Sequence, residues 1–137
     1  MTMRIRMLFS KQKIESFDSV RLTVTGMRCA QEFELLCKGD KTEVALYDLI
    51  YTDEEKVRRL NKSVAVDTAD VLSLLNECCL LKWDGFCGAN PRGVRDGYMF
   101  ELRAEVNAGR AIGAHGSNNY PRRYHQLKNG IMQMLNK

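Results

Sequence analysis

The stretch YMFELRAEVNAGRAIGAH, residues 98–115, decides the fold. Its first nine residues alternate between apolar and mostly charged side chains, as in a strand with one buried and one solvated face. NAG, at 107–109, suits a three-residue hairpin loop with Gly109 in the left-handed conformation, and RAIGAH then returns as the second strand. This segment therefore predicts an antiparallel hairpin. The apolar positions of its first strand are Tyr98, Phe100, Leu102, Ala104 and Val106.

The same alternation recurs in the N-terminal half, at 3–9, 20–24 and 33–37. KGDK, at 38–41, supplies a Gly-Asp turn into a further apolar run at 42–50. Successive strands joined by short turns predict an antiparallel meander.

Helix signals follow the meander and return at the C-terminus. Thr52 and Glu55 have capping-box spacing, which predicts a short helix to about Leu60. Asp67 is placed to cap a second helix, and Pro121 to open a third. The second helix would carry an apolar stripe of Val71, Leu72, Leu74, Leu75, Cys78 and Cys79, and the third one of Tyr124, Leu127, Ile131 and Leu135.

These elements predict one α+β domain over residues 1–137. Its antiparallel sheet, formed by the meander and the C-terminal hairpin, would have about three helices packed on one face.

The composition is that of an ordinary globular chain. Of its 137 residues 45% are hydrophobic and 28% are charged, with a net charge of +4. Apolar runs are too short for a membrane helix, and the N-terminal one is too short for a signal peptide. Five cysteines without C-x-x-C spacing favour reduced thiols over disulfides or zinc. We therefore expect a cytoplasmic protein with no membrane association, no metal and no cofactor.

The glycine-rich segment WDGFCGANPRGVRDG, at 83–97, is the first candidate binding element. Long irregular loops in compact domains are often functional, although this one could instead be a surface loop pinned by Trp83 and Phe86. It matches no phosphate-binding glycine motif. Its candidate ligand-binding residues are Trp83, Asp84, Arg92, Arg95 and Asp96.

A second candidate is GSNNYPRR, at 116–123, in front of the last helix. Turn and capping rules explain its first six residues, but Arg122 and Arg123 would occupy a first helical turn, which favours negative charge. The arginines could form a salt bridge with a carboxylate, for which Asp53, Asp84 and Asp96 are candidates, or hold an anion with the helix N–H groups. The candidate anion-binding residues are Ser117, Asn118, Asn119, Tyr120, Arg122 and Arg123.

The histidines and cysteines show no spacing typical of a metal site or a catalytic motif. His115 is expected to point away from the core. A nucleophilic arrangement of Cys87, His115 and Asp96 can be written down, but a chain with five cysteines and two histidines permits one by chance.

The solvated sheet face would carry charges of both signs, which indicates cross-strand charge pairs and makes nucleic-acid binding unlikely. A homodimer could form through the edge at 3–9 or through an apolar face of the strand at 44–50.

Four patterns in residues 83–137 resemble a group of small uncharacterised bacterial proteins: WxG at 83–85, DGxxFxL at 96–102, Gly109, and GSNNYPxxY at 116–124. The resemblance implies a strand hairpin followed by a capped helix and a bacterial origin, and it implies no activity.

The expected function is therefore that of a non-enzymatic binding or interaction module. Its recognition surface would combine the loop 83–97 with the start of the last helix, and its partner would be a protein or a small anionic ligand. The alternative is an enzyme or sensor that handles a small ligand bearing a phosphate or carboxylate group.

Overall fold

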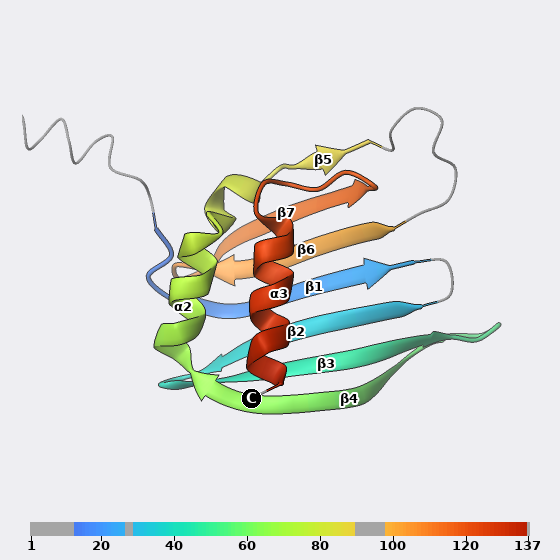
Figure 1. The fold of residues 1–137 in the computed structure, drawn as a ribbon, viewed down its shortest axis with the longest axis horizontal. Coiled ribbons are helices and arrows are strands. Elements are labelled where there is room, and N and C mark those ends of the chain that lie inside the picture. Colours follow the sequence, from blue (N-terminus) through green and yellow to red (C-terminus); the bar gives the residue numbers. More distant parts are fainter. Residues whose placement is uncertain (1–12, 27–28, 90–97, 137) are drawn as a thin grey trace, which may run out of the picture.

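A computed structural model describes residues 13–26, 29–89 and 98–136 of the chain. It has an α+β fold with one seven-stranded sheet and two α-helices in the described part (Figure 1). The elements are β1 (Phe17–Thr25), β2 (Ala30–Lys38), β3 (Lys41–Tyr51), β4 (Lys56–Asp67), α2 (Thr68–Glu77), the short 3₁₀ helix η1 (Leu80–Trp83), β5 (Cys87–Gly88), β6 (Met99–Val106), β7 (Arg110–Ser117) and α3 (Tyr124–Leu135).

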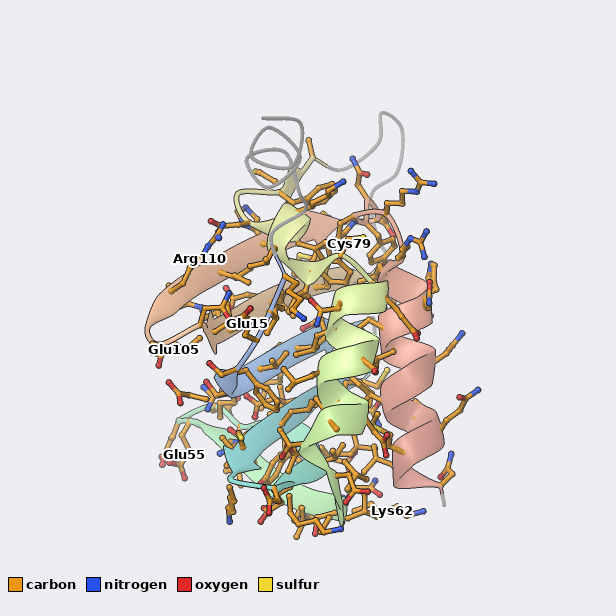
Figure 2. All side chains as sticks on the ribbon, turned by 90° about the vertical axis from the view of Figure 1, so that its left-hand side faces the viewer. Glu15, Glu55, Lys62, Cys79, Glu105 and Arg110 are labelled. Atoms are coloured by element: carbon orange, nitrogen blue, oxygen red, sulfur yellow. The ribbon has the colours of Figure 1, made fainter. Side chains whose placement is uncertain are left out.

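The strands lie in the order β4-β3-β2-β1-β6-β7-β5. All neighbours are antiparallel except β5, which runs parallel to β7. The edge-on view in Figure 2 shows α2 and α3 on the same face of this sheet. The predicted class, an antiparallel sheet with helices on one face, is confirmed.

One hydrophobic core fills the space between the sheet and the two helices. Val20, Leu22 and Leu102 in the central strands are fully buried beneath Leu75 of α2 and Leu127 of α3. In the described ranges, no helix is long and apolar enough to cross a membrane.

The hairpin predicted over residues 98–115 forms, but its first strand begins at Met99, and Tyr98, an apolar position of the predicted strand, is exposed. Phe100, Leu102, Ala104 and Val106 are buried, while the residues between them are exposed. The loop has positive φ at all three residues, with Gly109 at 107°.

The helix predicted after Thr52 is wrong, because residues 56–67 form strand β4. Glu55 donates its backbone N–H to Thr52 Oγ1 (3.1 Å), and the Thr52 hydroxyl donates to Glu55 O (3.0 Å). These bonds close the β3–β4 turn instead of capping a helix. The described part therefore has two α-helices where about three were expected.

The helix predicted after Asp67 is confirmed as α2. Asp67 occupies the N-cap position without a side-chain capping bond, and its carboxylate accepts a hydrogen bond from Lys41 Nζ (2.5 Å). Val71, Leu74, Leu75 and Cys78 of the predicted stripe are buried. The strand predicted at 3–9 lies outside the described residues.

On the face opposite the helices, the meander carries a network of four charges. Arg21 donates to Glu34 (Nη2–Oε2 2.7 Å) and pairs with Glu32 (Nε–Oε1 3.1 Å). Arg58 of β4 contacts the same two carboxylates, with Nε 2.6 Å from Glu32 Oε2, and its guanidinium lies 3.9 Å from the ring centroid of Tyr47. Both glutamate side chains are 7% exposed. Burial opposes the charge on Arg58, but the two carboxylates outweigh it and raise its pKa. The predicted cross-strand charge pairs are thus present.

Candidate functional site

A pocket of about 370 Å³ lies beside the start of α3, next to η1. We call it the basic pocket, because three of the side chains that line it are cationic. Its lining residues are Cys79, Lys82, Trp83, Phe86, Pro121, Arg122 and Arg123. It thus joins parts of both predicted elements, the loop that begins at Trp83 and the segment before the last helix.

The end of α2 positions one wall of the pocket. Cys79 adopts a left-handed conformation (φ 55°), which turns the chain from α2 into η1 beside the start of α3 (Figure 2). Trp83 closes η1, where its indole Nε1 donates to Cys78 O (3.2 Å) and its ring stacks on Tyr124 at 6.2 Å between centroids. The indole is thereby fixed by both helices.

The opposite wall is a turn, and its position corrects the predicted helix start. Tyr124 donates its N–H to Pro121 O (3.2 Å), and Arg123 has φ 70°, the left-handed value that the third residue of a type II turn requires. Helix α3 begins only at Tyr124. Arg122 and Arg123 therefore precede the helix and do not occupy its first turn.

Arg123 reaches the carboxyl end of the neighbouring helix. Its Nη1 donates to the backbone oxygen of Glu77, the last residue of α2 (3.2 Å), and to Gln126 Oε1 (3.3 Å). The end of a helix carries unpaired carbonyls and a partial negative charge, so a guanidinium is favourable there. The expected salt bridge is wrong for two of its three candidates, because Asp53 and Asp84 form no ion pair with either arginine in the described part. Asp96 lies outside that part.

The remaining charge of the basic pocket is not neutralised by the residues that the structure describes. Lys82 and Arg122 are exposed, and neither has an ion pair or side-chain hydrogen bond within those residues. The first turn of α3 contains no acidic residue. The N–H groups of that turn thus add to the positive potential.

The polar side chains in front of the arginines serve the loop itself. Asn118, with φ 53°, exchanges two hydrogen bonds with the backbone of Tyr98 (2.7 and 3.0 Å). Asn119 donates from Nδ2 to Ala89 O (3.4 Å), and Ser117 ends β7. These predicted ligand residues are at the loop, but they do not line the basic pocket.

Tyr120 anchors the loop through aromatic contacts. Its ring stacks on Tyr124 (4.4 Å between centroids) and meets Phe100 at 5.5 Å. Burial raises the pKa of both tyrosine hydroxyls. Tyr120 is therefore a packing residue that ties the loop to Phe100 and Tyr124.

Two glycines let the loop approach the sheet. Gly88 and Gly116 are paired across β5 and β7, and the backbone oxygen of Asn119 lies where a Cβ on either would stand. At Gly88 the Cβ position is 2.7 Å from this oxygen. Only glycine fits such a contact without moving the loop.

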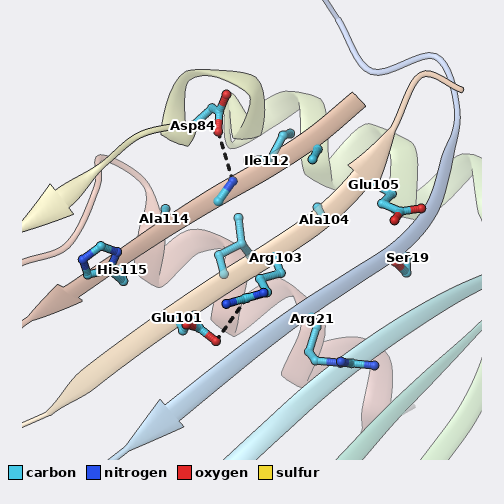
Figure 3. A pocket seen from close by; sticks show the side chains of 13 residues that line it. Ser19, Arg21, Asp84, Glu101, Arg103, Ala104, Glu105, Ile112, Ala114 and His115 are labelled. Carbon is cyan, nitrogen blue, oxygen red and sulfur yellow. Dashed lines mark hydrogen bonds and ion pairs between the residues drawn. The ribbon is translucent and has the colours of Figure 1, made fainter. Parts of the chain in front are cut away.

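Asp84 points away from the basic pocket. Its Oδ1 accepts the Gly113 N–H (3.0 Å) and lines a separate hollow on the open face of the sheet (Figure 3). The other three candidates from the glycine-rich segment, Arg92, Arg95 and Asp96, lie outside the described residues. The pocket residues Cys79, Lys82 and Phe86 were not predicted as ligand contacts, because they come together only through the turn at Cys79.

The structure brings together Cys87 and His115, two members of the nucleophilic arrangement that the sequence permitted but did not favour. Cys87 Sγ lies 3.3 Å from His115 Nε2, on the exposed face of the sheet. His115 points away from the core as predicted. Nowhere in the described ranges do three or more His, Cys, Asp or Glu side chains form a group that could hold a metal ion.

Comparison of the chain with protein-family models, curated proteins and solved structures found no match. The resemblance to small bacterial proteins thus stays a prediction.

Proposed function

We propose that this protein is a non-enzymatic binding module whose recognition surface is the basic pocket. Its ligand carries a phosphate or carboxylate group, presented by a small molecule or by a protein partner. The observation that carries the proposal is the convergence of Lys82, Arg122 and Arg123 on one pocket with an apolar wall.

The three cations supply the donors that such a group requires. Arg123 uses only Nη1 in its two hydrogen bonds, so Nε and Nη2 remain for a ligand. Arg122 and Lys82 add a second guanidinium and an ammonium group. Charge-assisted bonds of this kind are roughly twice as strong as neutral ones.

The apolar wall favours a ligand with an organic body. The rings of Trp83 and Pro121 are held by burial, and Phe86 is half-buried beside them. The pocket volume of about 370 Å³ lies within the usual range for small-molecule sites, about 300–1,000 Å³. An aromatic or aliphatic group bearing one phosphate fits this combination of charge and ring surface.

The described lining favours binding over turnover. It contains no carboxylate and no imidazole to act as a general base, and its potential nucleophiles are the Cys79 thiol and the Lys82 amine. An enzyme or sensor that handles the same anionic group is the alternative, and it predicts chemical conversion of the bound ligand.

The experiment uses the single tryptophan of the chain as its reporter, because Trp83 lines the pocket. Phenyl phosphate, inorganic phosphate and phenol are titrated separately while the Trp83 emission is recorded. We expect a saturable change with phenyl phosphate, a weaker response to phosphate and none with phenol. Lys82→Gln and Arg122→Gln should each weaken binding about ten-fold, the loss of one charge-assisted bond of about 1.5 kcal/mol.

Lys56→Gln is the matched control, since it removes one exposed positive charge from the distant β3–β4 hairpin. It should leave the affinity unchanged. An equal loss in this variant would show that only the net charge attracts the anion. Absence of a saturable signal with phenyl phosphate would refute the pocket, and release of phenol would favour the enzymatic alternative.

A further inference from the structure

The open face of the sheet, opposite the basic pocket, carries a thiol–imidazole pair. Cys87 and His115 are register partners on the parallel strands β5 and β7, and their side chains project from the same face with Sγ 3.3 Å from Nε2. Both residues are exposed. The thiol is therefore within hydrogen-bond reach of a base and open to a reactant.

Backbone bonds hold the two residues in this register. His115 donates its N–H to Phe86 O (3.0 Å), and Gly85 donates to Gly113 O (2.8 Å). Asp84 Oδ1 then accepts the Gly113 N–H (3.0 Å). Three bonds thus join residues 84–86 to β7 immediately before Cys87. The contact between the side chains follows from the strand pairing.

A hollow of about 540 Å³ opens beside the imidazole (Figure 3). Ala111 and Gly113 of β7 line this hollow and leave it open because they are small, whereas the neighbouring lining residues have larger side chains. Other lining residues carry charges of both signs: Asp84, Glu101 and Glu105 against Arg21 and Arg103.

Glu101 is the register partner of His115 on β6, and its carboxylate lies 3.4 Å from Arg103 Nε. The charged groups that face the imidazole from the neighbouring elements are therefore the Glu101–Arg103 pair and Asp84. Because Glu101 is paired with Arg103, Cys87 is the side chain that lies within hydrogen-bond distance of the imidazole among the described residues.

We propose that Cys87 is a nucleophilic thiol that exchanges with low-molecular-weight disulfides, and that His115 is the general base that takes its proton. The imidazole accepts the thiol proton, and the resulting thiolate attacks one sulfur of the disulfide. A new S–S bond to Cys87 forms as the old one breaks. The leaving thiolate receives the proton back from the imidazolium, so the step needs no further oxidant or reductant.

The chemistry of the site favours a disulfide over a carbonyl substrate. Attack on a carbonyl requires preorganised donors for an oxyanion, whereas thiol–disulfide exchange proceeds from the thiolate alone. The hollow offers charges of both signs, which suits a zwitterionic peptide disulfide such as oxidised glutathione. Cys87 is thus a site for reversible modification that lies apart from the basic pocket.

The test treats the full-length protein with oxidised glutathione and follows each cysteine by peptide mass spectrometry. Cys29 is the control inside the same chain, because it is exposed and makes no contact with a histidine in the described part. We expect Cys87 to react roughly ten-fold faster than Cys29 at about pH 6.5. This ratio should fall towards one near pH 9, where an ordinary thiol ionises unaided.

Two substitutions decide the role of each residue. Cys87→Ser should abolish the fast modification, and His115→Gln should reduce the rate at Cys87 to that at Cys29 without changing Cys29. Buried Cys78 must stay unmodified, which verifies the fold; if His115→Gln exposes it, His115→Asn takes its place. Equal rates at Cys87 and Cys29 in the parent protein, or an unchanged Cys87 rate in the histidine variant, would overturn the proposal.

Discussion

The two faces of the sheet, which alternate residue by residue along each strand, differ in how closely their side chains are packed. On the face covered by α2 and α3, side chains and backbone meet so closely that Gly116 has no room for a methyl group. On the open face of the same strand, Gly113 has no neighbour within 4 Å of its Cβ position. The covered face fixes the loop that carries the arginines, and the open face leaves Cys87 and His115 accessible. Stability and reactivity are thus separated across the thickness of one strand.

The test of this difference with the largest expected effect compares Gly116→Ala with Gly113→Ala. The first places a methyl group against the backbone oxygen of Asn119, and we expect a loss of about 2–4 kcal/mol in the free energy of unfolding. The second should change it by less than about 1 kcal/mol, because its methyl group meets no neighbour and alanine restricts the unfolded chain. Urea denaturation measures both. Equal losses would contradict the close approach at Gly116.

A second test uses pH to probe the covered face. Burial, with a smaller contribution from the nearby charge of Glu77, raises the pKa of the Cys78 thiol to about 11. The unfolded chain therefore loses this proton at lower pH than the folded chain does, and stability falls as pH rises from about 9 to 11. Tyr124 contributes in the same direction, because its pKa is raised as well.

We expect the decline to amount to roughly 1–3 kcal/mol in urea unfolding at about pH 11. Cys78→Ala should reduce the slope, whereas Cys87→Ala on the open face should leave it as it is. A decline unaffected by Cys78→Ala would exclude the buried thiol as a cause.

The test with the smallest expected effect compares two ion-paired glutamates on the open face, one in the meander and one in the C-terminal hairpin. Glu34 is 7% exposed and contacts both Arg21 and Arg58, so Glu34→Gln should cost about 1–2 kcal/mol. Glu101 is 54% exposed and contacts Arg103 alone, and Glu101→Gln should stay within about 0.5 kcal/mol. Thermal unfolding at low and at high salt measures the stability loss of each variant. A similar cost for both would place the meander network among ordinary surface pairs.

The sequence was most informative where local patterns and tertiary structure agree. The β6–β7 hairpin follows from alternation and a glycine loop, and α2 follows Asp67 with its predicted apolar stripe largely buried. Thr52 and Glu55 misled because the bond from the Glu55 N–H to Thr52 Oγ1, which is half of a helix capping box, also closes a hairpin turn. Residues 56–67 form a strand because they pair with β3 along its whole length, and the local sequence does not reveal this pairing.

The candidate site was predictable only in part. Arg122 and Arg123 were singled out because they break a local rule, and Arg123 proves to bond with the carbonyl that ends α2. Its partner could not be inferred, since it is a backbone atom of another helix. Cys87 and His115 meet because a two-residue strand runs parallel to β7, and so short a strand leaves no periodic signal in the sequence.

At the other end of the sheet, β4 presents twelve residues along an edge. An antiparallel pairing of two such edges centred on Arg59 would set arginine against arginine and Lys56 against Lys62. Like charges directly opposite one another oppose strand addition. The exposed basic residues of β4 therefore disfavour the pairing of this edge with the same edge of a second copy of the chain.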